Sequence, residues 1–164
     1  HLRKDFVMRV LLVLACLCFS LAANSATITV VNNDNSHEPL ILTKERLHSM
    51  PQTTYTTHLP WIDGHSAFTG VKVTDFFEEQ GIELPEVVTI SALNHYAMEL
   101  LKSDIEAYQP IIAYLRDSEP MSVRDKGPYW LIYSLSDHPQ IDNSLYHSQM
   151  VWQMDKIELH ADKK

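Results

Sequence analysis

The chain has 164 residues, 45% of them hydrophobic, and its 13 Lys and Arg against 21 Asp and Glu give a formal net charge of −8. The length indicates a single domain, and the acidic balance excludes nucleic acid as a partner, because binding to phosphates needs clustered Lys and Arg. With only 4 Gly and 8 Pro and no biased tract, the composition also excludes a linker-rich or disordered chain. After the N-terminus no apolar run approaches the roughly 20 residues of a stable membrane span.

The first 26 residues are predicted to be upstream sequence followed by a secretory signal peptide. Met8 is the expected start, and Arg9 gives a short basic region before the apolar residues 10–21. Residues 22–26 are mostly small, which is typical of a cleavage site. The sequence therefore predicts cleavage after Ala26 and a periplasmic or secreted domain over residues 27–164.

Both cysteines, Cys16 and Cys18, belong to this N-terminal segment. The mature domain is therefore expected to contain neither a disulfide nor a thiolate. A lipoprotein acylated at Cys16 stays open as an alternative to a cleaved form without an anchor.

Short strands dominate the pattern along the mature chain. β-Branched, aromatic and apolar runs predict strands over residues 27–31, 53–57, 87–92, 97–101, 111–115 and 130–133, and a short apolar run over 40–42 leads into a predicted helix. The closing segment alternates at Met150, Trp152 and Met154 and then changes phase at Ile157, which predicts a β-bulge in a last strand. Six or more short strands with a few brief helices indicate a β-rich α+β domain.

Three brief helices are expected between the strands. Thr43 is the predicted N-cap of the first. Thr74 and Gly81 are predicted to start and stop the second, because Thr accepts from free N–H groups and Gly adopts the left-handed conformation that ends a helix. Ser103 and Glu106 have the spacing of a capping box and predict the start of the third.

Nucleophilic and metal catalysis find little support. There is no Gly-x-Ser-x-Gly motif, and no cysteine follows residue 26. His58, Asp63 and His65 lie close together in the chain and could form part of a metal site. No His-Glu-x-x-His or paired Cys-x-x-Cys spacing accompanies them, so histidines scattered over the surface are the favoured interpretation, and no metal ligand is assigned.

A basic group in this acidic chain is formed by Arg116, Arg124 and Lys126, next to Gly127 and Pro128. Such a loop binds anions through the guanidinium fork and through backbone N–H groups. The alternative is that Arg124 and Lys126 pair with neighbouring acidic side chains and only hold the loop. The residues by themselves leave the two interpretations open.

Asn94, His95 and Tyr96 directly follow a predicted strand. Polar and aromatic side chains at the end of a strand suit a planar heteroaromatic ligand, by stacking and hydrogen bonding. An ordinary hairpin turn explains the same residues equally well. Together the two segments are compatible with a small anionic or heteroaromatic ligand.

Several short segments of the chain occur in a recognisable order. They are residues 68–71, 89–96, 119–121, 124–128 and 151–159. In this order the sequence resembles the oxidoreductase molybdopterin-binding domain of the sulfite-oxidase superfamily, in its small exported single-domain form. The resemblance implies a mixed-sheet α+β fold, molybdopterin held in a cleft of loops, and a redox or sensory partner protein.

The same resemblance implies a set of cofactor-binding residues and shows two departures from the family. The implied set is Asn94, His95, Tyr96, Arg124, Lys126 and Gly127. Catalytic members use a cysteine thiolate as a molybdenum ligand on the segment that matches residues 53–61, where this chain has none. They also carry a Ser and a Lys that grip the pterin phosphate, at the positions of Met150 and Trp152. Neither Thr nor His replaces a soft thiolate, so tight molybdenum binding is not expected.

Two hypotheses about function stay open. In the first, the protein is an exported molybdopterin-binding-like domain whose redox catalysis is altered or lost. In the second, it is a cofactor-free binding or sensory module for an anionic or aromatic small ligand. Enzymatic activity is left undecided, because a shared fold does not carry a shared reaction.

Overall fold

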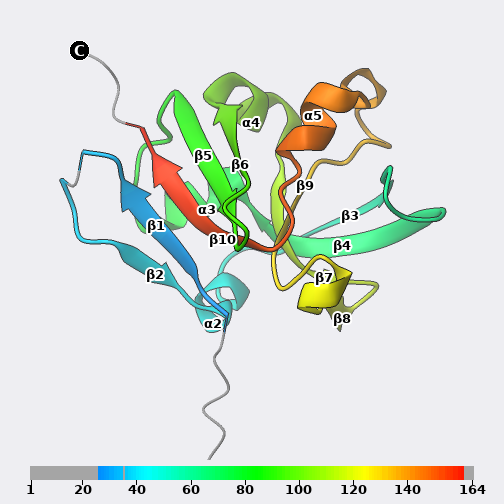
Figure 1. The fold of residues 1–164 in the computed structure, drawn as a ribbon, viewed down its shortest axis with the longest axis horizontal. Helices are drawn as coiled ribbons and strands as arrows, with labels where there is room; N and C mark the ends of the chain where they lie inside the picture. Colours follow the sequence, from blue (N-terminus) through cyan, green and yellow to red (C-terminus); the bar gives the residue numbers. More distant parts are fainter. Residues whose placement is uncertain (1–25, 35, 161–164) are drawn as a thin grey trace, which may run out of the picture.

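A computed structural model describes residues 26–34 and 36–160, which form ten strands in two sheets with short helices between them (Figure 1). The α+β class expected from the sequence is confirmed. Both cysteines and all of the predicted signal peptide except Ala26 lie outside the described residues. Within the described part of the chain no helix is long and apolar enough to cross a membrane.

The first sheet, sheet A, is mixed and joins the two ends of the described chain. Its strands, in spatial order, are β2 (Leu40–Leu42), β1 (Ile28–Asn32), β10 (Met154–Leu159), β5 (Val87–Ala92) and β6 (Ala97–Leu101). Strands β1 and β10 pair in parallel, and the other neighbours are antiparallel. The register of β10 against β5 shifts between Met154 and Lys156. The bulge predicted in the last strand is therefore confirmed.

The second sheet, sheet B, is antiparallel throughout. It contains β3 (Thr53–His58), β4 (His65–Lys72), β7 (Ile111–Arg116) and β8 (Glu119–Pro120) in that order, with β9 (Trp130–Ile132) also paired to β7. Gly70 lets β4 approach β7 closely, because a Cβ at this position would lie 1.9 Å from the carbonyl oxygen of Ile112. The register of the two strands also shifts next to this glycine.

The buried side chains form two hydrophobic clusters, one on each face of sheet B. Side chains alternate across a strand, so β7 sends Ile112 and Tyr114 into the cluster shared with sheet A and Ile111 and Ala113 into the other. The second cluster also holds Trp130, which is fully buried. Sheet B is therefore packed on both faces, and it supports the loops at its end.

The helices are short. They are α2 (Lys44–His48), α3 (Val73–Gln80), α4 (Lys102–Tyr108) and α5 (Ser144–Gln149), with 3₁₀ turns η1 (Val123–Asp125) and η2 (Pro139–Ile141). Thr43 is the N-cap of α2 and accepts from the backbone N–H of Arg46 at 3.3 Å. Gly81 ends α3 at φ 63°. Both of these predictions are confirmed.

The other two predicted N-caps are wrong. Helix α3 starts one residue before Thr74, whose hydroxyl instead donates to Gln109 Oε1 at 2.6 Å. Helix α4 starts at Lys102, so Ser103 lies inside its first turn. In both cases the helix begins directly where a strand ends, and the last strand residue occupies the N-cap position without a side-chain hydrogen bond. The end of the preceding strand, and not a local capping motif, therefore decides where each of these two helices begins.

Candidate functional site

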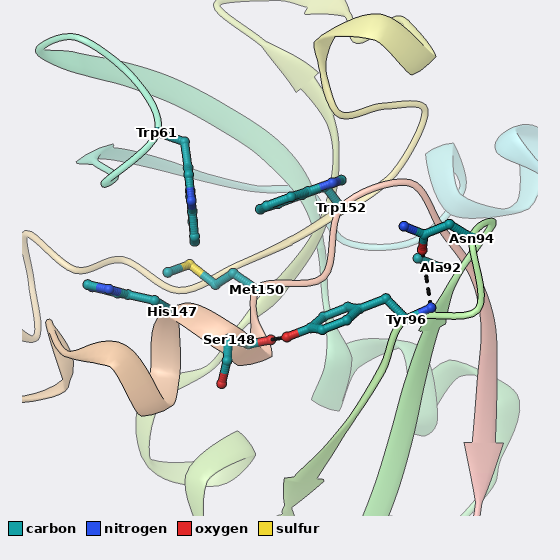
Figure 2. Close-up of a pocket in the computed structure, with 8 residues that line it drawn as sticks. All are labelled: Trp61, Ala92, Asn94, Tyr96, His147, Ser148, Met150 and Trp152. Atoms are coloured by element: carbon teal, nitrogen blue, oxygen red, sulfur yellow. Dashed lines mark hydrogen bonds between the residues drawn. The ribbon is translucent and has the colours of Figure 1, made fainter.

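An aromatic cavity of about 290 Å³ opens at the junction of the two sheets (Figure 2). Three separate segments supply its walls: the loop after β3, the turn between β5 and β6, and the segment from α5 to β10. The lining residues are Trp61, Ala92, Asn94, Tyr96, His147, Ser148, Met150 and Trp152. A concave site with mainly apolar walls and a few polar groups is the usual form of a small-molecule site.

Tryptophan rings form the rigid part of this wall. The rings of Trp61 and Trp152 meet edge to face, with centroids 5.2 Å apart and an interplanar angle of 75°. Trp130 supports Trp61 from the core at 5.9 Å, and its indole N–H donates to the carbonyl of Met150 at 3.2 Å. Met150 is 1% exposed and lies between His147 and the rings of Trp61 and Trp152 (Figure 2). Edge-to-face packing of this kind fixes ring orientation, so the apolar wall is formed before any ligand arrives.

The β5–β6 turn closes the cavity on another side. The backbone N–H of Tyr96 donates to Asn94 Oδ1 at 3.1 Å, and the Tyr96 hydroxyl donates to the carbonyl of Ser148 at 2.7 Å. His95 adopts φ 68° in this turn, which directs it away from the cavity and into a neighbouring polar groove that also contains Ser91 and Lys156. The hydrogen bond from Tyr96 to Ser148 ties this turn to α5.

The basic loop reaches the cavity through one residue. Lys126 Nζ lies 4.7 Å from the centroid of the Trp152 ring, a cation–π contact. The backbone N–H of Gln153 donates to the Lys126 carbonyl at 3.0 Å, and the Gln153 carbonyl accepts from Leu93 N–H at 3.0 Å. Gln153 therefore connects the basic loop to the β5–β6 turn.

The residues predicted to bind a cofactor are thus only partly brought together. Asn94 and Tyr96 line the cavity, and Lys126 lies against its wall. Arg124 is exposed on η1 and is absent from the lining. Gly127 is buried and serves the backbone, because a Cβ there would lie 2.0 Å from the carbonyl oxygen of Met121.

No pattern in the sequence marks the two lining residues His147 and Ser148 as part of a site. Both belong to α5, a helix of six residues that follows an irregular segment. The helix is placed by its neighbours: the carbonyl of Ser148 accepts from Tyr96, and the hydroxyl of Tyr133 donates to Gln149 Oε1 at 2.8 Å inside the core. Such contacts join residues far apart in the chain, so no local pattern reports them.

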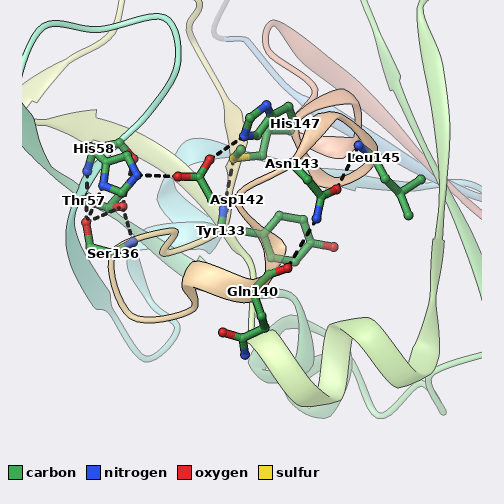
Figure 3. Close-up of polar contacts among 10 residues, drawn as sticks. Thr57, His58, Tyr133, Ser136, Gln140, Asp142, Asn143, Leu145 and His147 are labelled. Atoms are coloured by element: carbon green, nitrogen blue, oxygen red, sulfur yellow. Dashed lines mark hydrogen bonds and ion pairs between the residues drawn. The ribbon is translucent and has the colours of Figure 1, made fainter.

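A His–Asp–His cluster, formed by His58, Asp142 and His147, extends from the cavity wall (Figure 3). Asp142 Oδ2 lies 2.8 Å from His58 Nε2, and Asp142 Oδ1 lies 2.7 Å from His147 Nε2. These hydrogen bonds hold the pKa of Asp142 below its usual range. His58 therefore pairs with Asp142 and not with Asp63, and the described residues hold no group of three His, Cys, Asp or Glu side chains that could bind a metal ion.

Thr57, next to His58, lies in the segment where the family resemblance implies a thiolate ligand. Its side chain is fully buried, and its hydroxyl contacts Ser136 Oγ at 3.2 Å and accepts from the Ser136 backbone N–H at 3.0 Å. Ser136 Oγ lies 3.0 Å from His58 Nδ1 (Figure 3). Thr57 thus ties β3 to the loop before η2, and none of the residues 53–58 lines the cavity.

Comparison with known proteins gives a likeness of fold. No model of a known protein family matches the chain, and no curated protein matches its sequence. The fold is similar to one in the crystal structure of the sulfane dehydrogenase SoxCD from Paracoccus pantotrophus, with a TM-score of 0.62, 13% identity and 88% of this chain covered. This chain spans 40% of the chain it matches there. The likeness therefore concerns the fold, over part of that chain.

Proposed function

We propose that this protein is an exported small-ligand-binding module, which keeps an oxidoreductase-type fold and binds a flat aromatic ligand in the aromatic cavity. The observation that carries this proposal is the preformed wall of Trp61, Trp152 and Met150, open to solvent beside Tyr96 and Asn94. The export of the domain rests on the predicted signal peptide. A redox or sensory partner protein would act on the ligand-bound form.

The size and chemistry of the cavity favour a ligand with a single aromatic ring or with two fused rings. Its volume of about 290 Å³ is at the lower end of the roughly 300–1,000 Å³ found for small-molecule sites. Trp and Met side chains offer polarisable surface to an aromatic ring, worth roughly 0.5–1.5 kcal/mol per contact beyond area burial. No described residue forms a hydrogen bond with the side-chain amide nitrogen of Asn94, whose oxygen accepts from Tyr96, so this nitrogen is available to an acceptor on the ligand.

The residues present do not fit a molybdenum–pterin group held by a thiolate. Residues 26–160 contain no cysteine, and Thr57 directs its hydroxyl into a structural network. Met150 and Trp152, at the positions where the family grips the pterin phosphate, offer an apolar surface. A hydroxyl and an imidazole lack the softness of a thiolate. The donor set therefore supports a binding role over thiolate-dependent redox chemistry.

A second candidate function rests on the fold alone. The similarity to a sulfane dehydrogenase structure favours a molybdopterin-binding-like domain that holds its cofactor without a cysteine and has altered redox chemistry. Lys126 and the backbone N–H groups of its loop would be the anion-binding groups in that case. Analysis of the purified full chain for molybdenum and released pterin separates this candidate from the first.

Calorimetric titration with 2-naphthamide, a neutral bicyclic probe, tests the proposed function. We expect saturable binding to the full chain and at least tenfold weaker binding to Trp152→Ala, because the variant loses a stacking surface and buried aromatic area. Ile41→Ala, an exposed position on β2 outside the cavity lining, is the matched control and should bind as the original protein does. Absence of saturable binding, or equal binding by Trp152→Ala, would refute the proposal.

A further inference from the structure

The His–Asp–His cluster borders the cavity through a single member. His147 belongs to the cavity lining and packs its ring against Trp61 at 6.0 Å. Its Nε2 is held by Asp142, which holds His58 with its other carboxylate oxygen. The side chains of His147, Asp142 and His58 are 24%, 34% and 41% exposed, so solvent protons reach all three.

The net charge of this cluster changes sign over an ordinary pH range. Histidine is the side chain that changes charge between about pH 5 and pH 8. With both imidazoles neutral, the carboxylate gives the cluster a charge of −1. With both protonated, the charge becomes +1, because the two hydrogen bonds keep Asp142 ionised as the pH falls, as its lowered pKa indicates. A neutral imidazole and an imidazolium both donate from Nε2, so the geometry is compatible with either charge.

We infer that the cavity selects aromatic anions under mildly acidic conditions and releases them near pH 8, with the His–Asp–His cluster as the element that senses pH. The inference rests on the proposed function, since it concerns the ligand of the same cavity. Lys126, whose Nζ lies 4.7 Å from the centroid of the Trp152 ring, adds a positive charge beside the Trp152 part of the wall. At acid pH both the His147 part and the Trp152 part of the wall therefore have a positive charge next to them.

The other titratable groups around the cluster do not reverse this sign. His65, whose ring lies 5.6 Å from that of His58, carries no negative charge in either protonation state of an imidazole. Tyr96, across the cavity, donates its hydroxyl proton to the carbonyl of Ser148. Asp142 is the carboxylate that contacts the two cluster histidines, whereas Asp104 accepts from the Tyr146 hydroxyl at 3.1 Å and Asp137 accepts from the Ser134 hydroxyl at 2.7 Å.

A pair of isosteric probes isolates the role of charge. 2-Naphthoate and 2-naphthamide have the same rings and nearly the same volume, and only the first carries a negative charge. Titrating the full chain with each probe at about pH 5.5 and about pH 8 should give a naphthoate affinity that is roughly five- to tenfold higher at the acid pH, as expected from a charge change of two units near the ligand. The affinity for naphthamide should be the same at both pH values.

Two variants attribute the effect to the cluster. In His58→Gln/His147→Gln the cluster keeps its negative charge at both pH values, so the pH dependence of naphthoate binding should disappear; His147→Gln alone should lose about half of the logarithmic effect. Because His147 lines the cavity, the quantity compared within each variant is the ratio of naphthoate to naphthamide affinity at the two pH values, and circular dichroism shows that each variant is folded. His37→Gln, on the exposed β1–β2 loop, should keep the full pH dependence.

The outcomes separate the two proposals. Equal naphthoate affinity at both pH values, with naphthamide still bound, would overturn the pH-dependent selection and leave the aromatic binding module intact. An unchanged pH dependence in the double variant would also overturn it. Failure of both probes to bind at either pH would overturn the inference together with the proposed function.

Discussion

Gly127→Ala is expected to destabilise the fold and displace the basic loop. The added Cβ would lie 2.0 Å from the Met121 carbonyl oxygen and 2.5 Å from its carbon, and these are backbone atoms that a rotamer change cannot move. The two backbone segments must separate by about 1 Å or more to restore van der Waals contact. Overpacking of this kind costs about 1–3 kcal/mol, and in a domain of this size that lowers the Tm by roughly 4–12 °C.

Thermal unfolding followed by circular dichroism measures the loss of stability, and naphthoate titration measures the loss of anion binding as Lys126 moves with the loop. Gly64→Ala is the control, because a Cβ there meets no atom within 4 Å although its φ is +64°. That backbone conformation costs about 1–2 kcal/mol for a residue with a Cβ, without an effect on binding. If Gly127→Ala unfolds within 1 °C of the original protein, with Gly64→Ala the less stable of the two, the close backbone approach is not what Gly127 provides.

Three further predictions concern single side chains. Lys126→Ala should weaken naphthoate binding severalfold and Arg124→Ala hardly at all, since of the two only Lys126 contacts the cavity wall. If calorimetry shows the larger loss for Arg124→Ala, the guanidinium of Arg124 is the anion-binding group instead. Tyr133→Phe should cost about 1–3 kcal/mol in urea unfolding, because it leaves the buried Gln149 Oε1 without its donor; a loss near zero would contradict this. The folded-state pKa of Asp142 is lowered, so its contribution to stability is present above its unfolded pKa and is lost as the pH falls through the folded value. Asp142→Asn should therefore unfold with a smaller change in urea midpoint between about pH 5 and pH 3 than the original protein, and an equal change would refute that linkage.

Many strands of this fold could be predicted because their cause lies in their own residues. The exceptions are β2, β8 and β4 (His65–Lys72), the last of which lies largely in a segment rich in turn residues. Residues 87–92 and 111–115 are apolar runs that become the buried strands β5 and β7. The phase change before Ile157 is visible in the sequence and becomes the bulge in β10. The capping motifs at Thr74 and Ser103 misled for a physical reason: both helices start at the end of a strand, so the N-cap is decided by the sheet.

The site could be predicted only where its residues lie near a turn. Asn94 and Tyr96 could be predicted because they directly follow a strand. Lys126 could be predicted because it lies in a basic loop of an acidic chain. The pairing of His58 with Asp142 joins residues 84 positions apart, and only the packing of α5 against the β5–β6 turn brings His147 to the cavity. Lys126, and not Arg124, contacts the cavity wall, and it does so from a left-handed backbone position, φ 71°, which residue type alone does not indicate.

The central claim is that this fold serves ligand binding without a thiolate-held molybdenum centre. The most direct measurement is the molybdenum content per polypeptide of the full chain, purified from a host that synthesises the molybdenum cofactor, together with the fluorescence of oxidised pterin released on denaturation. Loss of two charge-assisted phosphate contacts, each worth roughly 1.5–3 kcal/mol, weakens cofactor binding by several hundredfold or more, and the absent thiolate adds to this. We predict molybdenum and pterin far below one equivalent in protein that still binds 2-naphthamide. Near-stoichiometric molybdenum with pterin would contradict the account and favour a redox enzyme.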